Sequence, residues 1–487
     1  MGLRLGAKLA AAFVTVLAGI LLYVGYSQAI SLKYRNRLPA LPDLSNQPQA
    51  IRTHLTEADR TARAQATSAE AVGALALAYH ADMFYNEAER SYAVAEELSG
   101  GAWRWTYYRA MVHDARGDAA ALAAGLQRVV QRAPEFSQAW WRLGEVEFKA
   151  GHYDAAERAW RRVLSLPEPA RTTPAAGSPL RAAAAPISAY AAVDLARLAI
   201  LQGNPNSARE LLEGVTERAQ AFGPAYRVLG TAYEALGRSE DAKRSIRVAD
   251  RSAVYDPYFD PMIDALVRES RSSTFLLQQA ASADITTNGA WREYLIRRAL
   301  EFDPANSDAL YELASMLRVL RRYGEALALL ERHERTAPGD FQVLADIGRC
   351  LSGLQRFAEA EAVLRRALAA QDDANTRYDL GFVLDRTGRL KDAVAEYQRA
   401  LDHNPNHRDA LNNLGVALAR QNRFGPAALQ FERLVAVDPD NADAHTNLGA
   451  ILLTEGSRDR AAREFRTALQ LNPDHALARE ALRKLER

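Results

Sequence analysis

The chain has 487 residues, and its 61 basic and 60 acidic side chains give a formal net charge of +1 at pH 7. This balance gives no reason to expect a nucleic acid partner, because such partners require an excess of basic groups. The single cysteine, Cys350, excludes an internal disulfide and a thiolate zinc cluster.

A long apolar segment follows a short amino-terminal tail, residues 1–8. Residues 9–32 contain no charged side chain, and about 20 apolar residues are enough to span a bilayer. Tyr23 and Tyr26 lie where interfacial aromatic side chains are expected. We therefore predict that residues 9–32 form a transmembrane helix, a signal-anchor that contacts the lipid bilayer.

A cleaved signal peptide is the alternative, with Ser27–Gln28–Ala29 as a small-residue cleavage motif. The apolar run is longer than the core of a typical signal peptide, which has about 7–15 residues. This length favours a retained anchor. If the protein is bacterial, the short tail favours the cytoplasm and places the rest of the chain in the periplasm. The opposite orientation, with the repeats on the cytoplasmic face, is the alternative.

Residues 33–48 form a connector marked by Pro39, Pro42 and Pro48. The residue before a proline avoids the α conformation, so we expect this connector to be extended. A polar helix over residues 49–65 then begins the folded part of the chain.

Residues 49–254 are predicted to form an N-terminal set of helix pairs. The first pair is expected to begin near Ala69 and the second near Trp103, and in the third Gly144 precedes Trp160 by 16 residues.

Two parts of the chain depart from this pattern. Residues 165–187 are rich in proline and alanine and form an insertion within the N-terminal set. Residues 255–289 are predicted to be a degenerate repeat that joins the two repeat segments, with a docking face as the alternative.

Residues 290–487 carry the clearest repeat and end in a polar capping helix. Pro405, Pro439 and Pro473 stand 34 residues apart. A glycine recurs with the same period, followed by an alanine twelve residues later and an aromatic residue four residues after that: Gly381, Ala393 and Tyr397; Gly415, Ala427 and Phe431; Gly449, Ala461 and Phe465. A fixed period of this length is typical of a solenoid.

The period and these residues resemble the tetratricopeptide repeat. The resemblance implies an all-α right-handed superhelical solenoid of about ten helix-turn-helix units, here with one amino-terminal transmembrane helix. Small residues suit the place where the two helices of a unit cross, and Gly415 and Ala427 are expected to meet there. The last five units are expected to begin near Ser307, Phe341, Ala374, Arg408 and Ala442.

The sequence gives no evidence of a catalytic site. It contains no phosphate-binding glycine loop, no His-Glu-x-x-His motif and no Gly-x-Ser-x-Gly motif. His403 and His407 flank a turn, where we expect solvated side chains and no metal, and Cys350 is expected to be a buried, unreactive thiol. We predict a protein that is not an enzyme and needs no cofactor or metal.

One polar pattern remains as a candidate partner-binding site. Two residues before the recurring glycine, four successive units have a side chain that can hydrogen-bond a peptide backbone: Asp346, Asp379, Asn413 and Asn447. A similar asparagine ladder binds extended peptide in the repeat domains of O-linked N-acetylglucosamine transferases. The alternative is that these side chains bond a neighbouring backbone and fix the stack.

Together these patterns predict a membrane-anchored scaffold in a bacterial inner membrane, with repeats that hold partner proteins during assembly of an envelope complex. The alternative function is a structural accessory subunit built stably into a bacterial membrane enzyme complex.

Overall fold

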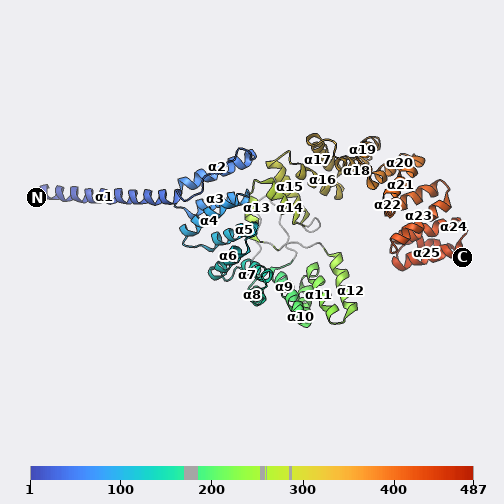
Figure 1. Cartoon of the computed structure of the whole chain (residues 1–487), viewed down its shortest axis with the longest axis horizontal. Coiled ribbons are helices and arrows are strands. Elements are labelled where there is room, and N and C mark those ends of the chain that lie inside the picture. The colour runs from blue at the N-terminus through green and yellow to red at the C-terminus, as the bar shows by residue number, and fades with distance from the viewer. Residues whose placement is uncertain (1, 169–184, 253–257, 259, 284–287, 486–487) are drawn as a thin grey trace. The chain divides into compact units, whose positions relative to one another are not determined.

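The computed structural model describes residues 2–168, 185–252, 258, 260–283 and 288–485 (Figure 1). The side chains of residues 2–16, 18 and 19 also lie outside this description. The described residues form 26 helices, which confirms the predicted all-α class. They fall into two compact units, Met1–Asn306 and Ser307–Arg487.

The first unit begins with two helices that precede the repeats, α1 (Gly2–Arg35) and α2 (Gln49–Ala64). Its remaining helices are α3 (Ala69–Ala81), α4 (Tyr85–Leu98), α5 (Trp103–Ala115), α6 (Ala119–Arg132), α7 (Ser137–Lys149), α8 (Tyr153–Ser165), α9 (Ile187–Leu201), α10 (Pro205–Arg218), α11 (Gly223–Ala235), α12 (Ser239–Arg251), α13 (Pro261–Glu269), α14 (Ser273–Ala281) and α15 (Gly289–Phe302).

The second unit is regular throughout. Its helices are α16 (Ser307–Val319), α17 (Tyr323–Thr336), α18 (Phe341–Gly353), α19 (Phe357–Ala370), α20 (Ala374–Arg386), α21 (Leu390–His403), α22 (Arg408–Arg420), α23 (Phe424–Val437), α24 (Ala442–Thr454), α25 (Arg458–Leu471) and α26 (Ala476–Leu485).

Consecutive helices pack as eleven pairs within the described residues, from α3 with α4 to α24 with α25. The predicted starts near Ala69 and Trp103 coincide with the first residues of α3 and α5, and the five predicted C-terminal starts coincide with those of α16, α18, α20, α22 and α24. The region predicted to be a degenerate repeat contains α14, which pairs with α15.

Local signals explain where the helices begin and end. Asp340 and Asn441 accept hydrogen bonds from the free backbone N–H groups at the starts of α18 and α24. Pro405 comes two residues after the last residue of α21, where a helix would otherwise continue.

The recurring glycine makes room for an aromatic ring of its own pair. A Cβ atom added at Gly415 would lie 2.7 Å from the Phe431 ring, and one added at Gly449 would lie 2.8 Å from the Phe465 ring. The ring of Phe431 therefore fills the space beside Gly415, and the expected contact of Gly415 with Ala427 stays a prediction. Both rings are almost fully buried.

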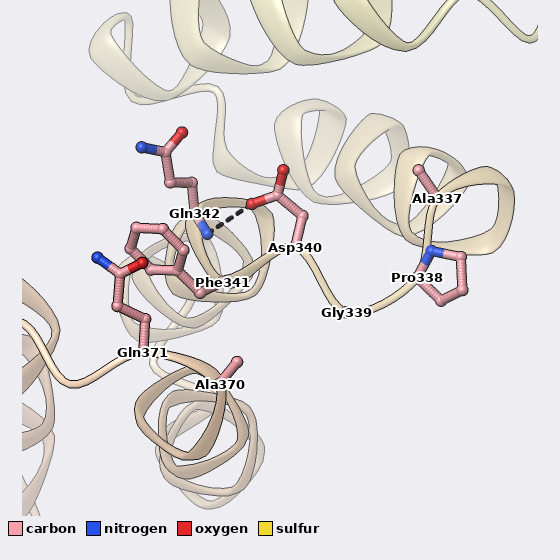
Figure 2. A pocket seen from close by; sticks show the side chains of 8 residues that line it. All are labelled: Ala337, Pro338, Gly339, Asp340, Phe341, Gln342, Ala370 and Gln371. Carbon is pink, nitrogen blue, oxygen red and sulfur yellow. Dashed lines mark hydrogen bonds between the residues drawn. The ribbon is translucent and has the colours of Figure 1, made fainter.

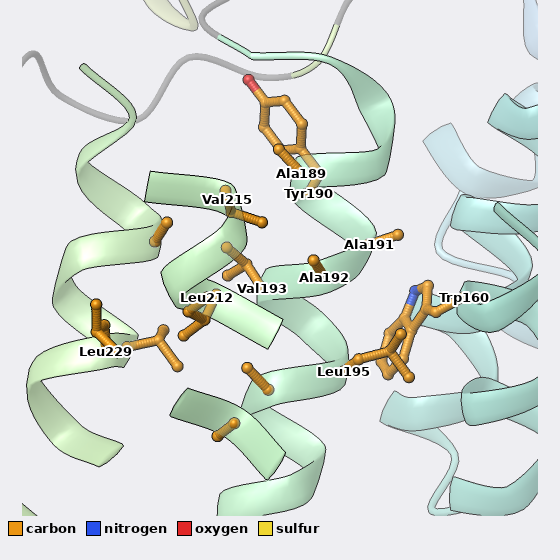
Figure 3. Close-up of a cluster of buried hydrophobic side chains, with 14 of the residues drawn as sticks. Trp160, Ala189, Tyr190, Ala191, Ala192, Val193, Leu195, Leu212, Val215 and Leu229 are labelled. Atoms are coloured by element: carbon orange, nitrogen blue, oxygen red, sulfur yellow. The ribbon is translucent and has the colours of Figure 1, made fainter. Parts of the chain in front are cut away.

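Neighbouring pairs then bury one another's apolar faces. Figure 3 shows one such cluster, where side chains of α9 meet Trp160 of α8, Leu212 of α10 and Leu229 of α11. One helix pair has too little apolar surface to form such a core alone, so the stacking of pairs stabilises the array.

The amino-terminal helix α1 covers most of the predicted tail and all of the predicted membrane segment, residues 9–32. Among the residues that could be searched, no helix is both long enough and apolar enough to cross a membrane. The side chains of much of the predicted segment, residues 9–16, 18 and 19, fall outside the described part of the chain.

The connector differs from the prediction at its start. Residues 33–35 continue α1, because the first proline comes only at Pro39. Beyond them Leu38 and Leu44 are buried, and Arg63 of α2 donates a 2.6 Å hydrogen bond to the Pro39 carbonyl. The connector thus packs on the folded part of the first unit.

We expect Gly415→Ala to lower the free energy of unfolding by about 1–3 kcal/mol, because its methyl group overlaps the buried Phe431 ring. The loss should shrink when Phe431→Leu is also present, since the two changes act on one contact. Urea unfolding followed by circular dichroism measures both effects.

The matched control is Gly324→Ala, at an exposed site in α17 with no neighbouring atom within 4 Å of the added methyl. This change should leave stability unchanged or raise it by up to about 1 kcal/mol. Equal effects at the two glycines would contradict the proposed role of Gly415.

Candidate functional site

The predicted polar residues lie on the first helices of four successive pairs in the second unit. Asp346 belongs to α18, Asp379 to α20, Asn413 to α22 and Asn447 to α24. Successive first helices contact one another, as α16 does with α18 and α20 with α22, whereas successive second helices make fewer contacts. The first helices therefore form the inner side of this unit.

The two carboxylates at one end of this row are held by arginines. Asp346 is 2% exposed, and its Oδ1 lies 2.7 Å from Arg349 Nη1 and 3.1 Å from Arg318 Nε. Arg349 also donates through Nε to Asp379 Oδ2 at 2.6 Å. Burial raises the pKa of Asp379 to about 6, which leaves it ionised at neutral pH beside Arg349. These contacts tie α16, α18 and α20 together.

The two amides at the other end form a separate chain of hydrogen bonds. Asn413 Nδ2 donates to the Tyr378 hydroxyl at 3.2 Å, and its Oδ1 accepts from Asn412 Nδ2 at 3.1 Å. Asn447 Nδ2 donates to Asn412 Oδ1 at 3.2 Å. Within the described chain no hydrogen bond reaches Asn447 Oδ1, so this half-buried oxygen can still accept one.

We call the row of Asp346, Asp379, Asn413 and Asn447 the polar line. It joins neighbouring helices through side chains, not through the backbone bonds of the alternative interpretation. The sequence analysis missed Arg349, Tyr378 and Asn412. The last two precede their polar-line residues directly, so adjacent polar positions on the first helices were the available signal.

Cys350 and the two histidines carry no chemistry beyond packing. Cys350 is buried, and burial raises the pKa of its thiol to about 12, as expected for an unreactive side chain. His403 ends α21 and is partly exposed, 3.3 Å from Asp372. The prediction that His407 is solvated is wrong. His407 is 9% exposed, and its ring caps α22 by accepting a hydrogen bond from the Ala410 N–H.

A shallow pocket of about 650 Å³ lies between the α17–α18 turn and the end of α19 (Figure 2). Its single titratable side chain, Asp340, accepts a hydrogen bond from the backbone N–H of Gln342 as the cap of α18. The other lining residues supply amides, small side chains and the Phe341 ring, so nothing in the pocket forms an acid–base pair. Across the described residues, no three His, Cys, Asp or Glu side chains cluster as metal ligands do.

In the first unit, part of the predicted junction lies against the first helices of earlier pairs. We call Tyr258 together with residues 260–272 the return segment. Tyr258 packs against Trp141 of α7 and Tyr190 of α9, with ring centroids 4.4 and 6.1 Å apart. Met262 and Ile263 pack against the apolar cluster that includes residues of α5 and α6.

Polar contacts continue along the return segment toward the start of the unit. Asp260 accepts a hydrogen bond from the Tyr107 hydroxyl of α5. Ser270 Oγ donates to the Ala81 carbonyl at 2.8 Å, and the Arg271 N–H donates to Asp82 Oδ1 at 2.7 Å. The segment therefore meets α9, α7, α5 and α3 in the reverse of their chain order.

A histidine joins the end of this segment to α2. His54 Nδ1 lies 2.8 Å from Asp82 Oδ2, and its Nε2 lies 2.9 Å from Glu269 Oε1 of α13. Burial favours the neutral ring, but the hydrogen bonds to the two carboxylates outweigh it and raise the pKa of His54 to about 9. His54 is thus protonated at neutral pH and links α2, the end of α3 and α13.

Comparison with known proteins identifies the class. Models described as "Tetratricopeptide repeat" match residues 119–164, 290–341, 378–431 and 422–476, and a further model with that description matches residues 320–380. These matched parts of the chain are tetratricopeptide repeats, and the helix pairs described above are the fold that the repeats form.

Individual relatives share parts of this array. "Tetratricopeptide repeat protein 1" of Schizosaccharomyces pombe (strain 972 / ATCC 24843) is 31% identical over 128 residues, which cover 24% of this chain and 12% of that protein. The chain thus spans about an eighth of that relative's length.

Two solved structures are also similar to parts of the chain. YrrB, described as a TPR protein with an unusual peptide-binding site, is 25% identical and covers 39% of this chain and 97% of its own, with a TM-score of 0.33. PilW, described as a widely conserved type IV pilus biogenesis factor, is 22% identical and covers 44% and 98%, with a TM-score of 0.39.

We predict that the link through His54 weakens at alkaline pH. Its folded pKa of about 9 lies above the ordinary value of 6.5. The stabilisation is therefore complete below about pH 6.5 and is lost as pH rises through about 9. Between pH 6.5 and 9.5 the thermal unfolding midpoint of the wild type should fall further than that of His54→Gln.

His152→Gln is the matched control, because His152 also pairs with a carboxylate but its side chain is 66% exposed. Its pH dependence should follow that of the wild type. An unchanged profile in His54→Gln would show that His54 does not link these helices.

Proposed function

We propose that the protein is a non-enzymatic scaffold whose second unit holds a partner protein as an extended peptide along the polar line. The observation that carries this proposal is the linked series of amides Asn412, Asn413 and Asn447 on the inner first helices. Tetratricopeptide repeats are protein-binding modules, and an amide side chain can both donate to and accept from a peptide backbone of any sequence.

The two ends of the polar line have different roles in this proposal. Arg318 and Arg349 neutralise Asp346 and Asp379, so the carboxylate end keeps the first helices in register. The amide end is half-buried and retains an acceptor at Asn447 Oδ1, which suits the N–H of an extended peptide.

We further propose that residues 9–32 anchor this scaffold in a bacterial inner membrane, with the repeats in the periplasm and a role in assembling an envelope complex. The support is the uncharged apolar sequence within α1 and the side chains at the end of that stretch. Leu21, Leu22 and Tyr23 are 64%, 75% and 72% exposed. Exposed apolar surface of this kind is stabilised by burial in hydrocarbon.

For the polar line, Asn413→Ala with Asn447→Ala should weaken partner binding at least tenfold, because the change removes the acceptor at Asn447 Oδ1 and the Asn413 amide that bonds Asn412 beside it. The full chain is used in a detergent pull-down, and the recovered partner is then titrated against each variant. Asn472→Ala, in the exposed turn after α25, is the matched control and should bind as the wild type does.

Loss of stability in the double variant with binding intact would show that the amides only fix the stack.

The same pull-down separates the scaffold from the alternative function, an accessory subunit. A transient partner that a peptide can displace supports the scaffold, whereas a stoichiometric partner that survives purification supports an accessory subunit.

For the anchor, the full chain should stay in the membrane pellet after an alkaline carbonate wash, and a variant lacking residues 2–32 should move to the supernatant. An alkaline phosphatase fused after Arg487 should be active if the repeats are periplasmic. Extraction of the full chain by carbonate would contradict the anchor, and an inactive fusion on a retained chain would place the repeats on the cytoplasmic face.

A further inference from the structure

We propose that the return segment fills a peptide-binding groove of the first unit, and that this groove also takes a partner peptide with an aromatic side chain and, two residues later, a carboxylate. The chain's own Tyr258 and Asp260 show the spacing. The proposal is independent of the polar line, because it concerns only contacts within the first unit.

The first subsite receives an aromatic ring. The rings of Trp141 of α7 and Tyr190 of α9 make interplanar angles of 61° and 67° with the Tyr258 ring. This edge-to-face arrangement is favourable because the positive edge of one ring meets the negative face of another. Trp141 Nε1 donates a 3.0 Å hydrogen bond to Asp194 of α9. The indole is therefore held in place by the repeats themselves, and the ring site does not depend on Tyr258 for its shape.

The second subsite receives a carboxylate. Asp260, which is 3% exposed, accepts hydrogen bonds through Oδ2 from the Tyr107 hydroxyl and from Arg142 Nη2, the latter at 3.4 Å. The Tyr258 hydroxyl also donates to this oxygen at 3.2 Å. Three donors around one buried carboxylate oxygen are what a site for an acidic side chain requires.

Arg142 contacts Asp260 and the Tyr258 ring of the return segment, but it is also held by residues of α5. Its Nε donates to the Tyr107 hydroxyl oxygen at 3.0 Å, and its Nη1 lies 3.5 Å from Asp114 of α5. Two of the three donors to Asp260 Oδ2, from Tyr107 and Arg142, thus belong to the repeats, whereas Oδ1 caps α13 by accepting from the N–H groups of Met262 and Ile263. A different carboxylate at the same place would meet the same donors.

The two ends of the return segment are held differently. Near Ser270, Arg298 of α15 donates hydrogen bonds to the carbonyls of Val267, Arg268 and Ser270. Asp82 accepts a hydrogen bond from the backbone N–H of Arg271. This end is fixed to two parts of the unit.

The Tyr258 end meets the repeats chiefly through Tyr258, Asp260 and two half-buried apolar side chains, Met262 and Ile263. A competing peptide needs only an aromatic ring and a carboxylate at the right spacing to replace the main contacts. Because the chain's own segment is tethered, its effective concentration is high, and the wild type should bind such a peptide more weakly than an opened variant.

The test uses a fluorescein-labelled peptide with the sequence of residues 256–264. The opened variant is the full chain with Tyr258→Ala and Asp260→Asn. We expect the peptide to bind this variant at least tenfold more tightly than the wild type. A control peptide with alanine in place of the tyrosine and of the aspartate two residues later should not bind.

Two substitutions in the opened background locate the binding site. Arg142→Met should abolish peptide binding, whereas Arg161→Met, at a 69% exposed arginine on α8, should leave it unchanged. If the opened variant keeps its helical spectrum and its unfolding transition but does not bind the peptide, or binds the control peptide equally, the return segment is a permanent brace and the proposal fails.

Hydrogen exchange on the wild type tests whether peptide displaces the return segment, even if the opened variant does not fold. We expect the amides of α13 to exchange faster than those of α5 and α7, and to exchange faster still in excess peptide while α5 and α7 stay unchanged. Exchange of all three helices at one rate, with no effect of the peptide, would overturn the proposal.

Discussion

The fit of an aromatic ring beside a glycine sets the geometry on which the rest of the structure depends. At Gly381, Gly415 and Gly449 an added Cβ atom would lie 2.7 or 2.8 Å from the ring that follows 16 residues later. This close approach fixes how the two helices of a pair cross. The pairs α20–α21, α22–α23 and α24–α25 share this contact, and in α18–α19 the Leu364 side chain takes the place of the ring beside Gly348. The apolar faces of successive pairs therefore match and can stack without a central core.

The same stacking decides what the inner side of each unit can do. Side chains on successive first helices come close enough to bond one another, which links the polar residues into two groups, one of carboxylates with arginines and one of amides. In the second unit that row ends in amides with an acceptor still available at Asn447. In the first unit the equivalent side is covered by the chain itself, through Tyr258 and Asp260. Both proposals for holding an extended chain thus rest on one architecture.

Features with a period could be predicted residue by residue from the sequence, and contacts between distant segments without a period could not. The starts of α16 to α24 and the row of Asp346, Asp379, Asn413 and Asn447 follow from residues that recur every 33 or 34 positions. The buried cap at His407 was missed because a polar residue in a turn can equally well be solvated. The return segment was missed because it joins residues 68 to 215 positions apart that share no repeat.

The central claim is that partners bind the inner first helices. Its most direct test is photo-crosslinking in cells from position 416, one turn after Asn413 on α22, and from position 429 on the second helix α23; Val416 and Leu429 are both exposed. The proposed scaffold predicts a protein adduct from position 416 and none from position 429. An adduct from position 429 alone, or from neither position, would contradict it.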